Sequence, residues 1–148
     1  MNTLTINNYI GGTWKNSYET KALPVENPST GEVISSVPLS GFKDVDEAVN
    51  AATKAFPKWS ALPVKERAQV FFRYKTLLEK HSRELAELVH KENGKIMSEA
   101  MAEIEKSIEL TEFACSMPQI IAGEILEVSR GVECRIDRHP VGVVASIT

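Results

Sequence analysis

The chain has 148 residues, of which 43% are hydrophobic and 25% charged, a composition typical of one soluble globular domain. Seventeen basic and 20 acidic residues give a formal net charge of −3 without a lysine or arginine block, which argues against nucleic-acid binding. No apolar run is long enough to span a membrane, and two cysteines are too few for a disulfide framework, so we expect a cytoplasmic protein.

Residues 1–40 predict short strands joined by turns. Residues 9–14 place two adjacent glycines between β-prone residues, the pattern of a two-residue hairpin turn, because both glycines can adopt positive φ. A second turn is predicted over 27–32, where Pro28 presets φ and Gly31 can take the left-handed conformation. The chain therefore opens with two β-hairpins.

Four helices are predicted next, over about 42–56, 63–80, 81–93 and 96–117. We expect Pro57 and Pro118 to end the first and fourth helices, and Gly94 to end the third. Arg67 is expected to point mainly outward. The apolar positions predict the buried faces: Val45, Ala48, Val49, Ala52 and Phe56 in the first helix; Val64, Ala68, Phe71, Phe72 and Leu78 in the second; Leu85, Leu88 and Val89 in the third; Met97, Met101, Ile104, Ile108 and Cys115 in the fourth.

Residues 123–139 predict two strands about a turn at 129–131. The second strand alternates, with Val132, Cys134 and Ile136 on one face. A single hairpin is only marginally stable in water, so this one must lie on another part of the protein or on another subunit.

The last nine residues, 140–148, form an almost unbroken apolar run, which predicts a strand buried on both faces of a parallel sheet. A parallel strand needs a crossover and a neighbour, so we expect the chain to be the front part of a larger protein. Solvent exposure of these side chains would argue against this interpretation. Ile147 and Thr148 end the run, where open α/β sheets bind ligands, although an ordinary strand end has the same spacing.

No catalytic or metal-binding motif is present. Cys115 and Cys134 lie on apolar faces, which favours packing over nucleophilic chemistry. The acidic residues of the fourth helix are interleaved with Lys106 and fit a solvated face better than a metal site. We therefore predict no catalytic residue and no metal ligand in this chain.

Several short motifs occur in the order and spacing of the aldehyde dehydrogenase superfamily, which the chain resembles over nearly its whole length. Residues 112–124 are similar to the methylmalonate-semialdehyde dehydrogenase branch, which is coenzyme A-acylating. The superfamily motifs lie at 27–33, 44–49, 56–60, Arg67, 92–95 and 140–144.

This resemblance implies an α/β fold in three parts. Residues 1–122 would be the N-terminal β-hairpins and helices of the NAD-binding domain. Residues 123–139 would be a β-arm for homo-oligomerisation. Residues 140–148 would be the first strand of a Rossmann-like NAD-binding sheet, in which Ile147 and Thr148 match the start of the segment lining the NAD site.

The resemblance also implies a reaction. A cysteine attacks the aldehyde substrate, hydride passes to NAD, and coenzyme A, the co-substrate, takes the acyl group with loss of carbon dioxide. By the family pattern the reacting cysteine, the glutamate base and the oxyanion-stabilising asparagine lie beyond Thr148, so we expect the chain alone to be inactive. Two alternatives remain: a non-acylating aldehyde dehydrogenase, and a non-catalytic module that pairs with a full-length relative.

Overall fold

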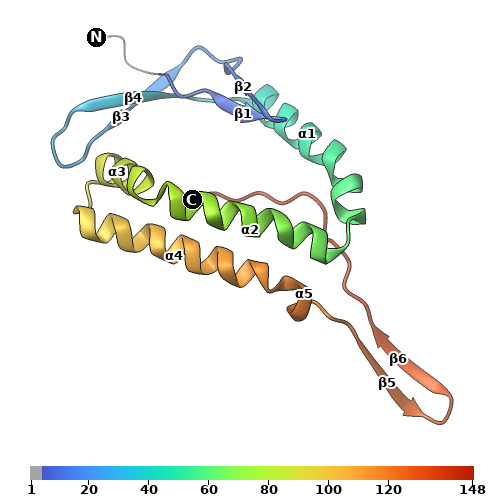
Figure 1. Cartoon of the computed structure of the whole chain (residues 1–148). Coiled ribbons are helices and arrows are strands. Elements are labelled where there is room, and N and C mark those ends of the chain that lie inside the picture. The colour runs from blue at the N-terminus through green and yellow to red at the C-terminus, as the bar shows by residue number, and fades with distance from the viewer. Residues whose placement is uncertain (1–4) are drawn as a thin grey trace.

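The computed structural model describes residues 5–148. Two small hairpins and one helix lie at one end of the molecule, three helices form a layer beside them, and a third hairpin projects from the far end (Figure 1). The elements are β1 (Asn8–Ile10), β2 (Thr13–Lys15), β3 (Ala22–Glu26), β4 (Val33–Pro38), α1 (Phe42–Ala61), α2 (Val64–Lys80), α3 (Ser82–Asn93), α4 (Met97–Cys115), α5 (Met117–Ile120), β5 (Glu124–Ser129) and β6 (Val132–Ile136).

Both N-terminal hairpins form as predicted. β1 pairs antiparallel with β2 across Gly11 and Gly12, which have φ of 62° and 83°. β3 pairs antiparallel with β4, and Gly31 in their connecting turn has φ of 72°. The Ile6 amide also donates to the Ser36 carbonyl at 2.8 Å, so the chain entering β1 runs beside β4.

The prediction that Pro57 ends the first helix is wrong, because α1 continues to Ala61. A proline removes one helical hydrogen bond, but its fixed φ is helical, so the residues after it can resume the pattern. The Ser60 hydroxyl donates to the Pro57 carbonyl at 3.2 Å and satisfies one acceptor of this last turn.

The predicted apolar face of α1 forms but is largely uncovered. Val45 and Val49 are about half exposed, because the main contact of α1 with another element is the small β1 strand. In α2, Phe72 is also half exposed, in contrast to the predicted burial, whereas Ala68 and Leu78 are buried. Periodicity identifies an apolar stripe, but burial requires a second surface opposite it.

The best-packed core lies between α3 and α4. Ala86 and Ala100 are completely buried, and Ile104 packs with them. The small alanines let the two helices approach closely, and larger apolar side chains close around the contact. These surrounding side chains are Leu85, Val89, Met97, Met101 and Ile108, all five of which were predicted to face inward. Leu88 was also predicted to face inward, but it is half exposed.

Helix ends follow local signals, with two differences from prediction. Gly94 ends α3 with φ of 77°, as predicted. Pro63 lies just before α2 as its N-cap rather than in its first turn. α4 ends at Cys115, and Pro118 lies in the first turn of α5, where a missing N–H removes no helical bond.

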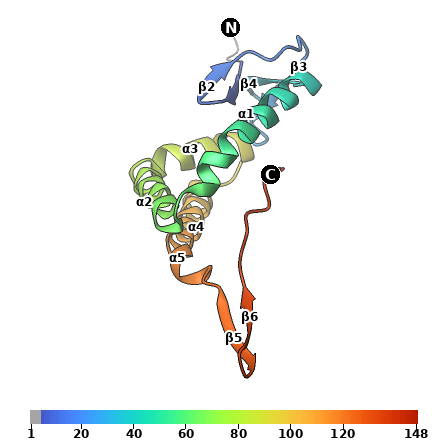
Figure 2. The ribbon, with the colours of Figure 1, turned by 90° about the vertical axis from the view of Figure 1, so that its right-hand side faces the viewer.

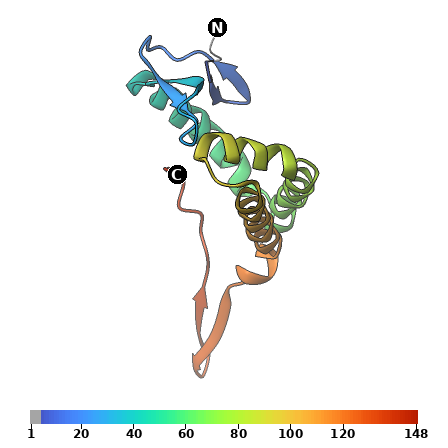
Figure 3. The same cartoon turned by 90° about the vertical axis from the view of Figure 1, so that its left-hand side faces the viewer.

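The predicted hairpin at 123–139 forms as β5 and β6, which pair antiparallel with Gly131 at φ of 74° in the turn. We call residues 123–139 the arm. In three views the arm extends away from the helices (Figures 1, 2 and 3). Both faces are therefore exposed, including Cys134, for which we predicted packing.

Residues 140–148 do not form the predicted strand. A strand exists through hydrogen bonds to a neighbour, and no segment among residues 5–148 pairs with this one. The expected burial is likewise absent, because Val141 is 91% exposed and Ile147 100% exposed. The segment instead runs back from the arm toward the hairpin end of the molecule (Figure 2).

The molecule exposes 11857 Å² of surface. A compact monomer of 16.4 kDa exposes about 7,500 Å². The excess reflects the projecting arm, the open face of α1 and the unpaired residues 140–148. Of the helices in residues 5–148, none combines the length and apolar character needed to cross a membrane.

Candidate functional site

The predicted cofactor residues, Ile147 and Thr148, lie at the exposed end of the segment 140–148. Their backbone groups are accessible, but the grooves described below are lined by other segments. Neither residue lines any of these grooves.

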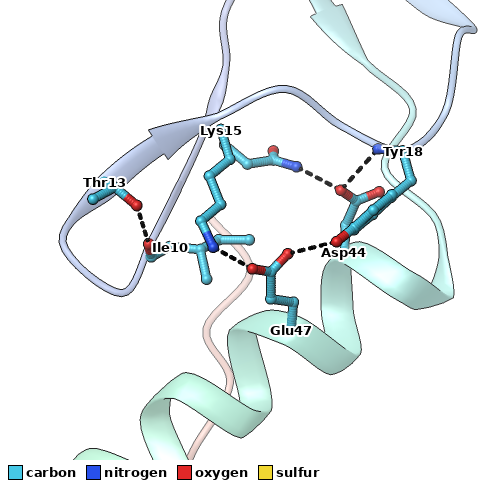
Figure 4. A network of polar contacts seen from close by, with 7 residues as sticks. Ile10, Thr13, Lys15, Tyr18, Asp44 and Glu47 are labelled. Atoms are coloured by element: carbon cyan, nitrogen blue, oxygen red, sulfur yellow. Dashed lines mark hydrogen bonds and ion pairs between the residues drawn. The ribbon is translucent and has the colours of Figure 1, made fainter.

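Asp44 organises a buried polar network between α1 and the chain around β1 and β2 (Figure 4). Its carboxylate accepts from the Gly41 amide at 3.1 Å and the Tyr18 amide at 3.2 Å. It also accepts from the Ser17 hydroxyl at 2.8 Å and the Asn8 side-chain amide at 3.2 Å. Desolvation raises the pKa of Asp44, but these four hydrogen bonds outweigh it and hold the pKa below its ordinary value.

A second carboxylate extends this contact at the surface. Glu47 pairs with Lys15 of β2 and accepts from the Tyr18 hydroxyl at 3.3 Å. The hydrogen bond between Lys15 and Glu47 raises the pKa of Lys15 and lowers that of Glu47. Lys15, Tyr18 and Glu47 border an open groove of about 610 Å³. The Glu47 carboxylate is already used as an acceptor from Lys15 and Tyr18, so these contacts attach the first hairpin to α1.

Two of the family motifs meet in the structure. The turn at 27–32 contacts the end of α3, where the Ser29 hydroxyl donates to the Gly94 carbonyl at 3.2 Å. A Cβ atom at position 94 would lie 2.7 Å from Ser29 Oγ and 2.9 Å from Pro28 Cγ. The sequence indicated Gly94 as a helix end, but the approach of Pro28 and Ser29 had no signal in it.

A separate apolar groove of about 310 Å³ lies between α2, α4 and α5. Arg67 is half-buried here, in contrast to the predicted outward direction, and its Nε atom is buried without a hydrogen-bond partner among the described residues. We call this surface the Arg67 groove. Its lining residues are Trp59, Val64, Arg67, Ala68, Phe71, Ala114, Met117 and Ile121.

The remaining reactive side chains are dispersed. Cys115 is buried and Cys134 is exposed on the arm. His81 contacts Glu84 at 3.0 Å, and His90 contacts the Lys95 carbonyl at 2.5 Å. Within the described chain, no three histidine, cysteine, aspartate or glutamate side chains gather closely enough to hold a metal ion.

Comparison with known proteins places these features in a family. The model of the aldehyde dehydrogenase family matches residues 14–148. The chain is 48% identical over 147 residues to malonate-semialdehyde dehydrogenase 1 of Geobacillus kaustophilus, covering 99% of this chain and 30% of that protein. It is 45% identical over 144 residues to malonate-semialdehyde dehydrogenase 2 of Bacillus cereus, with 97% and 30% covered. The chain thus spans about 30% of the length of these curated relatives.

Similarity to solved structures supports the same family. A Sinorhizobium meliloti protein described as a methylmalonate-semialdehyde dehydrogenase, in complex with NAD, superposes with a TM-score of 0.90 at 32% identity, over 95% of this chain and 29% of that one. The methylmalonate-semialdehyde dehydrogenase of Oceanimonas doudoroffii gives 0.84 at 39% identity, over 88% and 27%. The hairpins and helices are those of the N-terminal region of such enzymes, and the chain belongs to the aldehyde dehydrogenase family.

Proposed function

We propose that this chain is the N-terminal segment of an NAD-dependent, coenzyme A-acylating aldehyde dehydrogenase of the methylmalonate-semialdehyde type. The observation that carries the proposal is its 48% identity, over almost all its length, to the first 30% or so of a malonate-semialdehyde dehydrogenase. The structural likeness to an NAD complex supports the cofactor. The similarity of residues 112–124 to the acylating branch supports coenzyme A.

The substrate would be malonate or methylmalonate semialdehyde, and the products acetyl- or propionyl-coenzyme A, NADH and carbon dioxide. In such a reaction a cysteine thiolate forms the thioester, and coenzyme A then displaces it. Neither cysteine here suits that role: Cys115 is buried, and Cys134 lies on the exposed arm. We assign no step of the chemistry to a residue of this chain.

The chain would contribute in three parts: residues 1–122 to the NAD-binding domain, the arm 123–139 to homo-oligomerisation, and residues 140–148 to the first strand of the nucleotide-binding sheet. Ile147 and Thr148 would then contact NAD. Their exposed position and their accessible backbone are compatible with this role. They form no pocket alone, so further strands are needed to complete the site. We place the enzyme in the cytoplasm.

A chimera tests this function. The corresponding segment of the Geobacillus kaustophilus relative would be replaced by this chain, and NADH formation would be followed with malonate semialdehyde and coenzyme A. We expect an active enzyme that forms the acyl-coenzyme A product. A folded but inactive chimera would contradict the proposal, and a carboxylic acid product formed without coenzyme A would indicate a non-acylating enzyme.

The purified 148-residue chain provides the complementary test. With methylmalonate semialdehyde, NAD and coenzyme A, we expect no NADH, and any protein-dependent turnover would refute the assignment of the catalytic residues elsewhere. A defined complex with a full-length relative that alters the activity of that relative would instead favour a regulatory interaction module, a role to which the exposed arm is suited.

A further inference from the structure

Asn93 and Gly94 form the only Asn–Gly pair in the sequence. This pair is a reactive context for deamidation, because glycine has no Cβ atom to shield its backbone nitrogen from the side chain before it. Once deprotonated, the Gly94 nitrogen can attack Asn93 Cγ. The new C–N bond closes a succinimide ring while the C–NH₂ bond breaks and ammonia leaves. Water then opens the ring at either carbonyl and gives aspartate or isoaspartate, with no oxidation or reduction.

The fold requires a glycine in this pair. Gly94 ends α3 with φ of 77°, and a Cβ atom there would lie 2.7 Å from Ser29 Oγ. Any other residue would therefore combine backbone strain with a steric clash. The contact between α3 and the turn at 27–32 thus keeps a chemically labile pair in the chain.

The same geometry holds the reaction back. The Gly94 N–H donates to the His90 carbonyl at 3.0 Å, so the attacking nitrogen is engaged in a helical hydrogen bond. Asn93 is the last residue of α3, and its helical backbone keeps the Gly94 nitrogen out of line for attack on Cγ. The Gly94 carbonyl accepts from the Ser29 hydroxyl at 3.2 Å. The next residue is held as well, because His90 Nδ1 lies 2.5 Å from the Lys95 carbonyl.

We propose that Asn93 is a deamidation site gated by the fold. Its amide is stable while the end of α3 is closed on the turn at 27–32, and it is converted to aspartate and isoaspartate when this contact opens. The contacts that close the site all lie within residues 27–95, so the gate does not depend on what covers the surface.

The conversion makes a transient opening permanent. Either product places a negative charge at the carbonyl end of α3, where the helix dipole disfavours it. Isoaspartate also lengthens the backbone by one carbon, so the hydrogen bond from Gly94 to His90 cannot re-form with the same geometry.

The test follows deamidation at Asn93 in the purified chain at neutral pH, by peptide mass spectrometry and by enzymatic methylation of isoaspartate. Because only the opened fraction reacts, unfolding in guanidinium chloride should speed the reaction about tenfold or more. Ser29→Ala removes one hydrogen bond from the closed site and should speed the reaction of the folded chain about threefold. Ser60→Ala removes a similar bond at the end of α1 and is the matched control, which should leave the rate unchanged.

Amide hydrogen exchange identifies the motion. Exchange at Gly94 requires the same bond to His90 to break, so Ser29→Ala should raise exchange and deamidation by the same factor. If circular dichroism shows that Ser29→Ala is unfolded, low urea concentrations applied to the unchanged chain should raise both rates together. Equal deamidation rates in the folded and unfolded chain would overturn the gate, as would equal rates in Ser29→Ala and Ser60→Ala. An unfolded chain without isoaspartate would overturn Asn93 as a site.

Discussion

At the scale of single residues, Asp44 shows how a local signal acquires a tertiary role. It is the third residue of α1, where a carboxylate favours the positive helix end, and its bond to the Gly41 amide is of this local kind. Its bonds to Asn8 and Ser17 were not foreseeable, because those residues lie 36 and 27 positions away. Only the folded chain brings them to the same carboxylate.

We expect Asp44→Asn to lower the denaturant midpoint, because an amide nitrogen cannot accept the hydrogen bonds that one carboxylate oxygen accepts now. The pKa of Asp44 is lowered from 3.8 in the folded chain, so its contribution is complete above 3.8 and is lost as the pH falls below 3.8 and through the lower pKa of the folded state. Urea unfolding at several pH values below about 5 should therefore give a weaker pH dependence for the variant. Asp46→Asn, at an exposed site, is the control, and equal pH profiles for both variants would contradict this role.

Gly94 gives a sharper residue-scale prediction. Gly94→Ala should lower the free energy of unfolding by about 2 kcal/mol or more, from the positive φ and from the close approach to Pro28 and Ser29. Gly31 has φ of 72° but open space around it, so Gly31→Ala introduces backbone strain without a steric clash. It should lower the free energy of unfolding by less than Gly94→Ala. Equal losses in urea unfolding would show that the contact between the two motifs adds nothing.

At the scale of elements, the sequence predicted the helices but not how closely each packs against its neighbours. Ala100→Leu should overpack the contact between α3 and α4 and cost about 1–3 kcal/mol. Ala102→Leu, on the exposed side of the same helix, should be nearly neutral. Chemical denaturation of both variants measures the difference, and similar stabilities would place the core elsewhere.

The arm depends on a small residue at its base. A Cβ at Gly123 would press into the Ile136 carbonyl, and no flexible side chain is there to move. Gly123→Ala should therefore speed amide hydrogen exchange throughout β5 and β6 and leave α3 and α4 unchanged. Ala122→Ser, one position earlier, is the control, and unchanged exchange in the arm would show that its strands tolerate the shift.

At the scale of the whole molecule, the large exposed surface predicts a shallow unfolding transition. The chain buries about half of the surface that it exposes when unfolded, against about 68–70% for a compact domain of this size. Because the urea m-value scales with the surface exposed on unfolding, we expect it to be about a quarter below that of compact 148-residue domains. An m-value in the compact range would mean that the open faces are covered in solution.

The exposed segment 140–148 also bears on the family assignment. The expected burial of residues 140–148 is not found, so that argument gives no support. The ordered motifs and the family match over residues 14–148 carry the assignment independently of it. Ile147 and Thr148 were chosen by position and resemblance, and their contact with a nucleotide stays a proposal.

The sequence by itself determined the features that depend on a few neighbouring residues: the turns at Gly11, Gly31 and Gly131, the helix end at Gly94, and the apolar stripes. It also identified the family, because the order and spacing of the motifs can be read from the sequence without knowing any contact. Only the tertiary structure decided which stripes are buried, where Arg67 points, and that the arm stands alone. The physical reason is that burial is a property of two surfaces, and a local pattern describes only one of them.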